Sequence, residues 1–177
     1  MVNEVTRRRT KSSVKIAALL LLIAGGLVLI ALERVASFAS SPTRAHLVAL
    51  LGGKALSPKG VVFQRGEWDC GRAVYTMLTG DAAGARDIPV ISGKGASMAN
   101  LLQALNEKSP LWVFAKGDIS SARHFPVVAY LRWHHYVIVD SDAHGNVVVR
   151  DPSLGRIEYP AFIFQLEYGG YMLERTG

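Results

Sequence analysis

An uninterrupted apolar run near the N-terminus separates the chain into two parts with different hydrophobic patterns. About 17 apolar residues follow one another from Ile16 to Leu32, and no helical face of this run is polar. This length is at the lower limit for a helix that spans a bilayer. We therefore predict a transmembrane signal anchor at residues 14–32, preceded by a basic cytoplasmic tail at residues 1–13. A cleaved secretory signal peptide is the alternative interpretation of the same pattern.

The second part of the chain begins with helical periodicity. Apolar residues within 71–78 have the spacing of one helical face, which predicts a helix from about Cys70 that ends at Gly80. Ser97 is placed to cap a second helix, whose apolar residues recur at three- and four-residue intervals as far as Leu105.

The period then changes to that of strands. Short segments rich in β-branched and aromatic residues, separated by turn signals, occur at 111–114, 127–132, 135–139 and 147–150. Helices first and an antiparallel sheet afterwards predict an α+β domain over residues 61–177. Residues 33–60 contain several Pro and Gly turn signals around a short apolar stretch, which predicts a linker with one short helix.

The charge distribution excludes one class of function and sets an orientation. Five basic residues between Arg7 and Lys15, against Glu4, contribute +4 of the formal net charge of +6. No basic patch among aromatic residues follows Lys15, so we do not expect a nucleic-acid partner. Glu33 and Arg34 cancel directly after the apolar run, and the positive-inside rule then places residues 33–177 outside the cytoplasm. The predicted location is a single-pass protein of the inner or plasma membrane.

The chain has one cysteine, Cys70, which excludes an internal disulfide. Its place at the predicted start of a helix favours the thiolate, because unpaired backbone N–H groups and the helix dipole meet there. A buried, inert cysteine is the alternative interpretation.

Two further residues have the chemistry that a cysteine nucleophile requires. Strand alternation puts His135 on the more apolar face with Val137, whereas His134 shares the other face with Tyr136. Asp151 ends the next strand before a proline, where its carboxylate can reach a histidine on a neighbouring strand. The alternatives are a core histidine satisfied by the backbone and a simple Asp-Pro turn. No metal or cofactor is expected.

Three segments together resemble the bacteriocin-processing (double-glycine leader) cysteine peptidase family. They are Gln64–Gly71, with its Asp-Cys-Gly triplet, His135–Asp140, and Val148–Pro152. The resemblance covers roughly residues 60–173 and implies a papain-like fold. It implies Cys70 as nucleophile, His135 as base, Asp151 as the carboxylate that orients this base, and Gln64 as side-chain donor to the oxyanion. Asp69 is a lower-ranked orienting carboxylate or a cap of the helix.

This resemblance implies a cysteine endopeptidase that cuts a peptide or protein, after Gly-Gly or other small residues. Best-known members are joined to ABC transporters, but no Gly-x-x-x-x-Gly-Lys loop occurs here, because Val48 stands where its first Gly is needed. We therefore expect a stand-alone, membrane-anchored peptidase that meets export or assembly machinery in trans.

Two other functions stay open. The chain is either a catalytically silent peptide-binding module of a membrane export or assembly machine, or a papain-like acyl transferase or amidase.

The segment His46–Gly53 also loosely resembles the end of a double-glycine leader, which raises self-processing after Gly53. A short helix closed by C-terminal glycines is the preferred interpretation.

Overall fold

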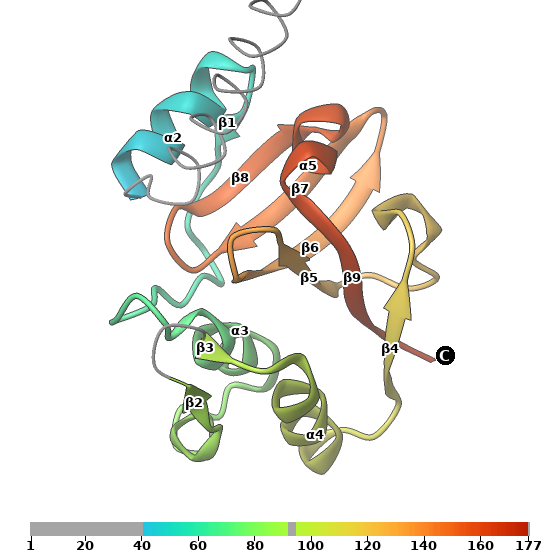
Figure 1. Cartoon of the computed structure of the whole chain (residues 1–177). Helices are drawn as coiled ribbons and strands as arrows, with labels where there is room; N and C mark the ends of the chain where they lie inside the picture. The colour runs from blue at the N-terminus through green and yellow to red at the C-terminus, as the bar shows by residue number, and fades with distance from the viewer. Residues whose placement is uncertain (1–40, 92–94, 177) are drawn as a thin grey trace, which may run out of the picture. The chain divides into compact units, whose positions relative to one another are not determined.

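The computed structural model describes residues 41–91 and 95–176 (Figure 1). These residues belong to one compact unit. The basic tail and the anchor predicted at residues 1–13 and 14–32 lie outside the described residues. Within the described part of the chain, no helix has the length and apolar character needed to cross a membrane.

An antiparallel sheet of seven strands organises the unit, in the order β1-β8-β7-β6-β5-β9-β4. The strands are β1 (Lys54–Ala55), β4 (Trp112–Lys116), β5 (Val127–Leu131), β6 (His135–Ala143), β7 (Asn146–Asp151), β8 (Gly155–Pro160) and β9 (Tyr168–Arg175). A small two-stranded sheet pairs β2 (Val90–Ile91) with β3 (Gly95–Ala96).

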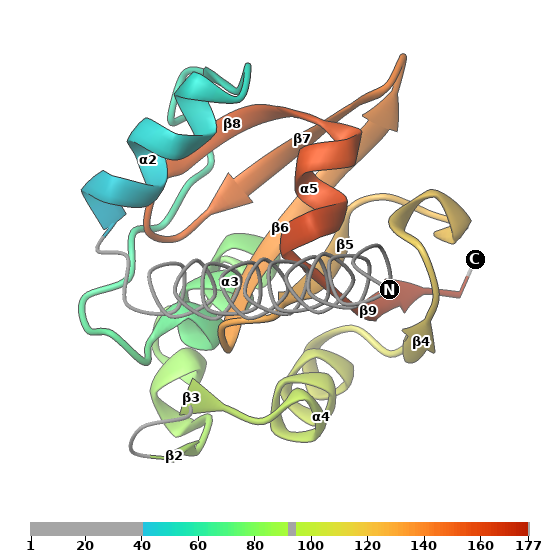
Figure 2. The ribbon, with the colours of Figure 1, turned by 45° about the horizontal axis from the view of Figure 1, so that its top comes forward.

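Helices pack on both faces of the large sheet. They are α2 (Ser41–Leu50), α3 (Cys70–Thr79), α4 (Met98–Lys108) and α5 (Ala161–Glu167), with short 3-10 helices at η1 (Gly84–Asp87) and η2 (Ile119–Ser121). Figures 1 and 2 show α2 and α5 on one side of the strands and α3 and α4 on the other.

Strand alternation builds two cores. On β6, Val137 and Val139 join the core that also contains Phe164 of α5, whereas Tyr136 and Ile138 join the core under α3 and α4. The two faces of the sheet are therefore both buried, and the α+β architecture predicted from the sequence is confirmed.

The predicted helix boundaries agree closely with the structure. α3 begins at Cys70, and Gly80 follows it in the left-handed conformation that ends a helix. The side chain of Ser97 accepts a hydrogen bond from the backbone N–H of Asn100 and caps α4. The capping role considered for Asp69 is wrong: its side chain makes no cap hydrogen bond within the described residues and lies 3.7 Å from Arg72 instead.

The predicted strands correspond to β4, β5, β6 and β7. β6 continues past residue 139 to Ala143, with an irregularity in its pairing to β7 between Val139 and Ser141. Strands β8 and β9 and helix α5 were not predicted. β8 extends the sheet beyond β7, and β9 is inserted between β5 and β4.

The short helix expected between residues 33 and 60 is α2, and it is attached to the sheet. Val48 belongs to the core of β5, β6 and β7, and β1 pairs with β8. Gly52 has a φ of 93°, and the N–H of Gly53 donates to the Val48 carbonyl at 2.8 Å. The two glycines therefore close α2, as the preferred interpretation of this segment predicted.

Candidate active site

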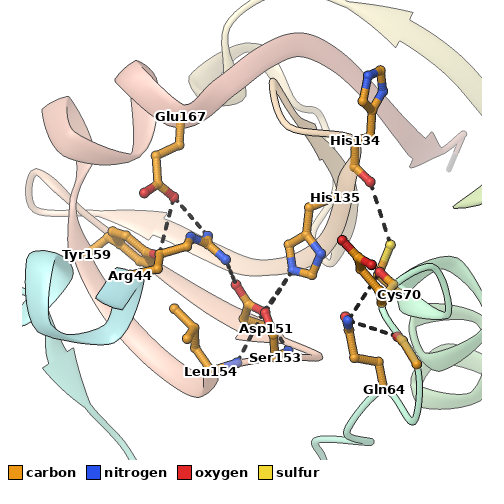
Figure 3. Close-up of polar contacts among 12 residues, drawn as sticks. Arg44, Gln64, Cys70, His134, His135, Asp151, Ser153, Leu154, Tyr159 and Glu167 are labelled. Atoms are coloured by element: carbon orange, nitrogen blue, oxygen red, sulfur yellow. Dashed lines mark hydrogen bonds and ion pairs between the residues drawn. The ribbon is translucent and has the colours of Figure 1, made fainter. Parts of the chain in front are cut away.

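Cys70 is the first residue of α3, and its side chain is almost completely buried. Its Sγ lies 3.9 Å from the carbonyl oxygen of His134, close enough for the thiol to donate a weak hydrogen bond (Figure 3). The thiol therefore lies at the helix N-terminus and against the turn that leads into β6.

Gly71 explains how the start of α3 approaches the sheet so closely. A Cβ atom at this position would lie 2.9 Å from the Ala96 side chain and 3.5 Å from the Tyr136 ring. Only a glycine lets the helix N-terminus pack here without displacing its neighbours. The Asp-Cys-Gly triplet thus has a packing reason as well as a chemical one.

His135 is the first residue of β6 and lies between Cys70 and Asp151 (Figure 3). Its Nε2 is 2.8 Å from Asp151 Oδ1, which leaves Nδ1 as the nitrogen for the thiol. Burial by itself would lower the pKa of His135. The charge and hydrogen bond of Asp151, together with the adjacent Cys70, outweigh burial and raise this pKa to about 9. The site therefore favours an imidazolium.

Asp151 ends β7 and is 0% exposed. Its Oδ1 accepts from the backbone N–H and hydroxyl of Ser153, at 2.8 and 2.7 Å, in addition to His135. Burial alone would raise the pKa of Asp151, but the charges of Arg44 and His135 and these hydrogen bonds hold it far below its usual range. The carboxylate is ionised and fixed in orientation.

The side chain of His134 is not part of the cluster of Cys70, His135 and Asp151. It has a φ of 59° in the turn before β6, and its Nδ1 makes a hydrogen bond with the Tyr130 hydroxyl. The side chains of His134 and His135 therefore have different surroundings, as strand parity predicted, although His134 itself precedes the strand.

Gln64 lies in the loop before α3, next to the end of β7. Its backbone N–H donates to the Pro152 carbonyl at 2.9 Å. Its side-chain nitrogen donates to the carbonyls of Gly66 at 3.0 Å and Glu67 at 3.4 Å. Its Oε1 is buried and has no hydrogen-bond partner among the described residues. The amide is held near the site, with its donors used inside its own loop.

Sequence reasoning missed the groups behind Asp151. Arg44 of α2 donates from Nη1 to Asp151 Oδ2 at 2.7 Å, although 107 residues separate the two in sequence. Glu167 and Tyr159 contact the same guanidinium. The one available signal was the spacing of Arg44 and Val48, which places both on the same face of a helix.

No group of three or more His, Cys, Asp or Glu residues within the described part of the chain could hold a metal ion.

The fold and the site together define a class of protein: an α+β domain with a papain-like fold, in which Cys, His and Asp meet at one end of an antiparallel sheet. The sequence pattern of the Peptidase C39 family matches residues 59–176, and the chain belongs to this family. No curated protein matches the chain.

Three solved structures illustrate the likeness in fold. A double glycine motif protease from an AMS/PCAT transporter, in complex with the leader peptide, is 20% identical, with a TM-score of 0.59 over 66% of this chain and 91% of that chain. The peptidase domain of Streptococcus mutans ComA is 20% identical, with a TM-score of 0.55 over 67% and 99%. The N-terminal peptidase C39 like domain of a toxin secretion ATP-binding protein from Vibrio parahaemolyticus is 13% identical, with a TM-score of 0.50 over 64% and 100%.

Proposed function

We propose that the protein is a cysteine peptidase in which Cys70 is the nucleophile, His135 the general base and Asp151 the orienting carboxylate. One observation carries this proposal: His135 lies between the only thiol of the chain and a fully buried carboxylate. A nucleophile, a base within reach of it, and a third group that orients the base are the parts that covalent acyl transfer requires.

The proposed reaction follows from these positions. The Cys70 thiolate attacks the scissile carbonyl carbon, and the carbonyl oxygen becomes an oxyanion close to the N-terminus of α3. The imidazolium of His135 then gives its proton to the leaving amine, and a thioester remains on Cys70. Water hydrolyses this thioester, with His135 accepting the proton of the water.

Gln64 is proposed to donate to the oxyanion together with the backbone N–H of Cys70. Its amide nitrogen now donates to two carbonyls of its own loop, at 3.0 and 3.4 Å. The longer of these bonds, to Glu67, is the one that we expect to break when substrate binds, because catalytic hydrogen bonds often form only in the complex. A single oxyanion donor typically stabilises the transition state by about 3 kcal/mol.

A cavity beside Cys70 supports a polypeptide substrate. It has a volume of about 410 Å³ and is lined mainly by apolar and aromatic side chains, among them Met98, Phe114 and Tyr171. His134 and Ala96 also line it. The carbonyl of His134 contacts Cys70, and Ala96 lies against Gly71. We propose that apolar side chains of the substrate occupy this cavity. We also propose that the enzyme cuts the peptide bond directly after Gly-Gly or other small residues.

The apolar run at residues 16–32 supports a membrane anchor. We propose that it holds the peptidase domain at the outer side of the inner or plasma membrane, where the substrate is an exported polypeptide. Export or assembly machinery then acts with the peptidase in trans.

Substitution of the nucleophile and the base tests the proposed activity. Cys70→Ala and His135→Ala should each lower peptide hydrolysis by about 10³-fold or more, because the two groups act as a unit. His124→Ala, which removes an exposed histidine that does not line the cavity beside Cys70, is the matched control and should retain hydrolysis. The measurement is mass spectrometry of new N-termini in the exported proteome and of cleaved test peptides. Hydrolysis that persists in Cys70→Ala would refute the cysteine mechanism, and transfer to an added amine instead of water would identify an acyl transferase.

A further inference from the structure

Arg44 is the one arginine or lysine that is buried in the described part of the chain. It belongs to α2, which lies before the family match at residues 59–176. Arg44 is nevertheless only 8% exposed. A buried guanidinium is costly unless its charge and its N–H groups are matched by partners.

The partners of Arg44 come from three other elements of the fold. Nη1 donates to Asp151 Oδ2 at 2.7 Å, and Nη2 donates to Glu167 Oε2 at 2.8 Å and to the Tyr159 hydroxyl at 3.2 Å (Figure 3). The guanidinium carbon also lies 6.0 Å from the ring centre of Trp133. The two ends of the planar fork thus hold two carboxylates, a geometry that a lysine cannot reproduce.

The two oxygens of Asp151 have different hydrogen-bond partners, and this difference links Arg44 to the proposed reaction. Oδ1 serves His135, Ser153 and the backbone N–H of Leu154, whereas Arg44 bonds to Oδ2. A carboxylate held at both oxygens cannot rotate about its terminal bond. Rotation would turn Oδ1 away from His135 Nε2 and would leave the imidazole without its orienting partner.

The charge of Arg44 acts in the same direction as its geometry. Its positive charge lies beside Asp151 and lowers the pKa of that carboxyl, together with His135. Asp151 therefore stays ionised in a position where burial alone would favour the neutral acid. Glu167 and Tyr159 in turn hold the guanidinium in place.

We propose that Arg44 is a positioning residue of the catalytic centre, so that α2, which precedes the family domain, completes the active site. This inference rests on the proposed function. Arg44 touches no substrate and acts through Asp151 on His135. Docking of α2 on the sheet is then a requirement for activity as well as for stability.

Arg44→Ala and Arg44→Lys in the full chain test the proposal. In Arg44→Ala we expect kcat to fall about 100-fold, because loss of the guanidinium displaces Asp151 and with it His135. KM should stay unchanged, because Arg44 does not line the cavity. The rate at which iodoacetamide alkylates Cys70, the only cysteine, should fall about tenfold or more because of the same displacement of His135. Guanidinium ion, added well below denaturing concentrations, should restore part of both rates by occupying the vacated space.

Controls separate positioning from folding. Arg123→Met, which removes an exposed arginine, should leave both rates unchanged, and guanidinium ion should not accelerate the parent or His135→Ala. A folded Arg44→Ala variant with the alkylation rate of the parent would overturn the proposal. A lowered rate that guanidinium ion does not change would overturn it too, since that result indicates a structural role alone.

The outcome stays decisive if Arg44→Ala does not fold. Arg44→Lys then carries the test: one ammonium group cannot replace two separated nitrogens, so its alkylation rate should also fall, and an unchanged rate would refute the inference. Alkylation requires no peptide. A parent protein that cleaves no peptide would therefore refute the proposed function, whereas the alkylation rates would still decide the role of Arg44.

Discussion

His135 experiences two opposed effects, and their balance decides its protonation. Removal of the imidazole from water disfavours its charged form, whereas the negative charge of Asp151 at 2.8 Å favours it. The second effect is the larger, and the pKa of His135 rises from 6.5 to about 9. At neutral pH the residue is therefore an imidazolium held between Cys70 and Asp151, which is the form that the proposed mechanism requires.

The raised pKa of His135 predicts how stability depends on pH. A group whose pKa is higher in the folded state binds its proton more tightly there, so its contribution to stability is complete below pH 6.5. This contribution is lost as pH rises from 6.5 through about 9. Urea denaturation of the full chain at pH 6 and pH 9.5 should therefore give a higher midpoint at pH 6.

The neighbouring histidine provides the control for this pH effect. His135→Gln should flatten the dependence between pH 6.5 and 9, whereas His134→Gln should leave it as in the parent. Equal slopes for the parent and His135→Gln would show that another group titrates in this range.

Some residues of the candidate site could be predicted from the sequence and others could not. Cys70, His135 and Asp151 stand at the ends of regular elements, and periodicity locates such ends; the structure brings these three together. Arg44 meets Asp151 only through tertiary packing across 107 residues, which no local pattern encodes. Ser153 was missed because a serine in a turn is ordinarily explained by the turn itself.

At the scale of elements, the contact between α3 and β3 sets the position of Cys70. Gly71 packs against Ala96, and the Tyr136 hydroxyl donates to the Ala96 carbonyl at 3.0 Å. The first turn of α3 is thus held against both the small sheet and β6. A change in the distance between α3 and β3 at this contact would move the thiol of Cys70 relative to His135.

Gly71→Ala should destabilise the protein by about 1–3 kcal/mol, because its Cβ would lie 2.9 Å from the Ala96 side chain. It should also lower kcat/KM through displacement of Cys70. Ala96→Gly removes the atom that clashes, so the double variant should recover most of the lost stability. Denaturation midpoints of the two single variants and the double variant form the cycle that measures this coupling. Strictly additive effects would refute the close contact.

Elements with regular, uninterrupted patterns were the ones predicted correctly. α4 has a capping serine and a helical apolar period, and β5 and β7 are rich in valine. β8 alternates charged and apolar residues as a strand does, but only four residues lie between its glycine and its proline, so the segment was too short for the pattern to be recognised. β9 contains Gly169 and Gly170, the second with a φ of 80°, and glycines inside a strand hide it from pattern analysis.

For the whole molecule, the charge is divided unequally along the chain. Residues 1–15 contribute +4 of the net +6, which leaves +2 for residues 16–177. Such a nearly balanced domain has no electrostatic reason to bind nucleic acid. The concentrated charge instead precedes the apolar run, where we expect it to set the orientation of the proposed membrane span.

The location of the peptidase domain decides which substrates it can meet, and it is testable with reporters. Because five basic residues precede the apolar run and Glu33 and Arg34 cancel after it, we expect the C-terminal domain outside the cytoplasm. Alkaline phosphatase fused after Gly177 should be active, and green fluorescent protein fused there should be dark. Removal of the charge bias, by replacement of the five basic residues from Arg7 to Lys15 with glutamine, should lower the phosphatase signal. A fluorescent C-terminal fusion in the parent would instead place the domain in the cytosol, where peptides are trimmed before export.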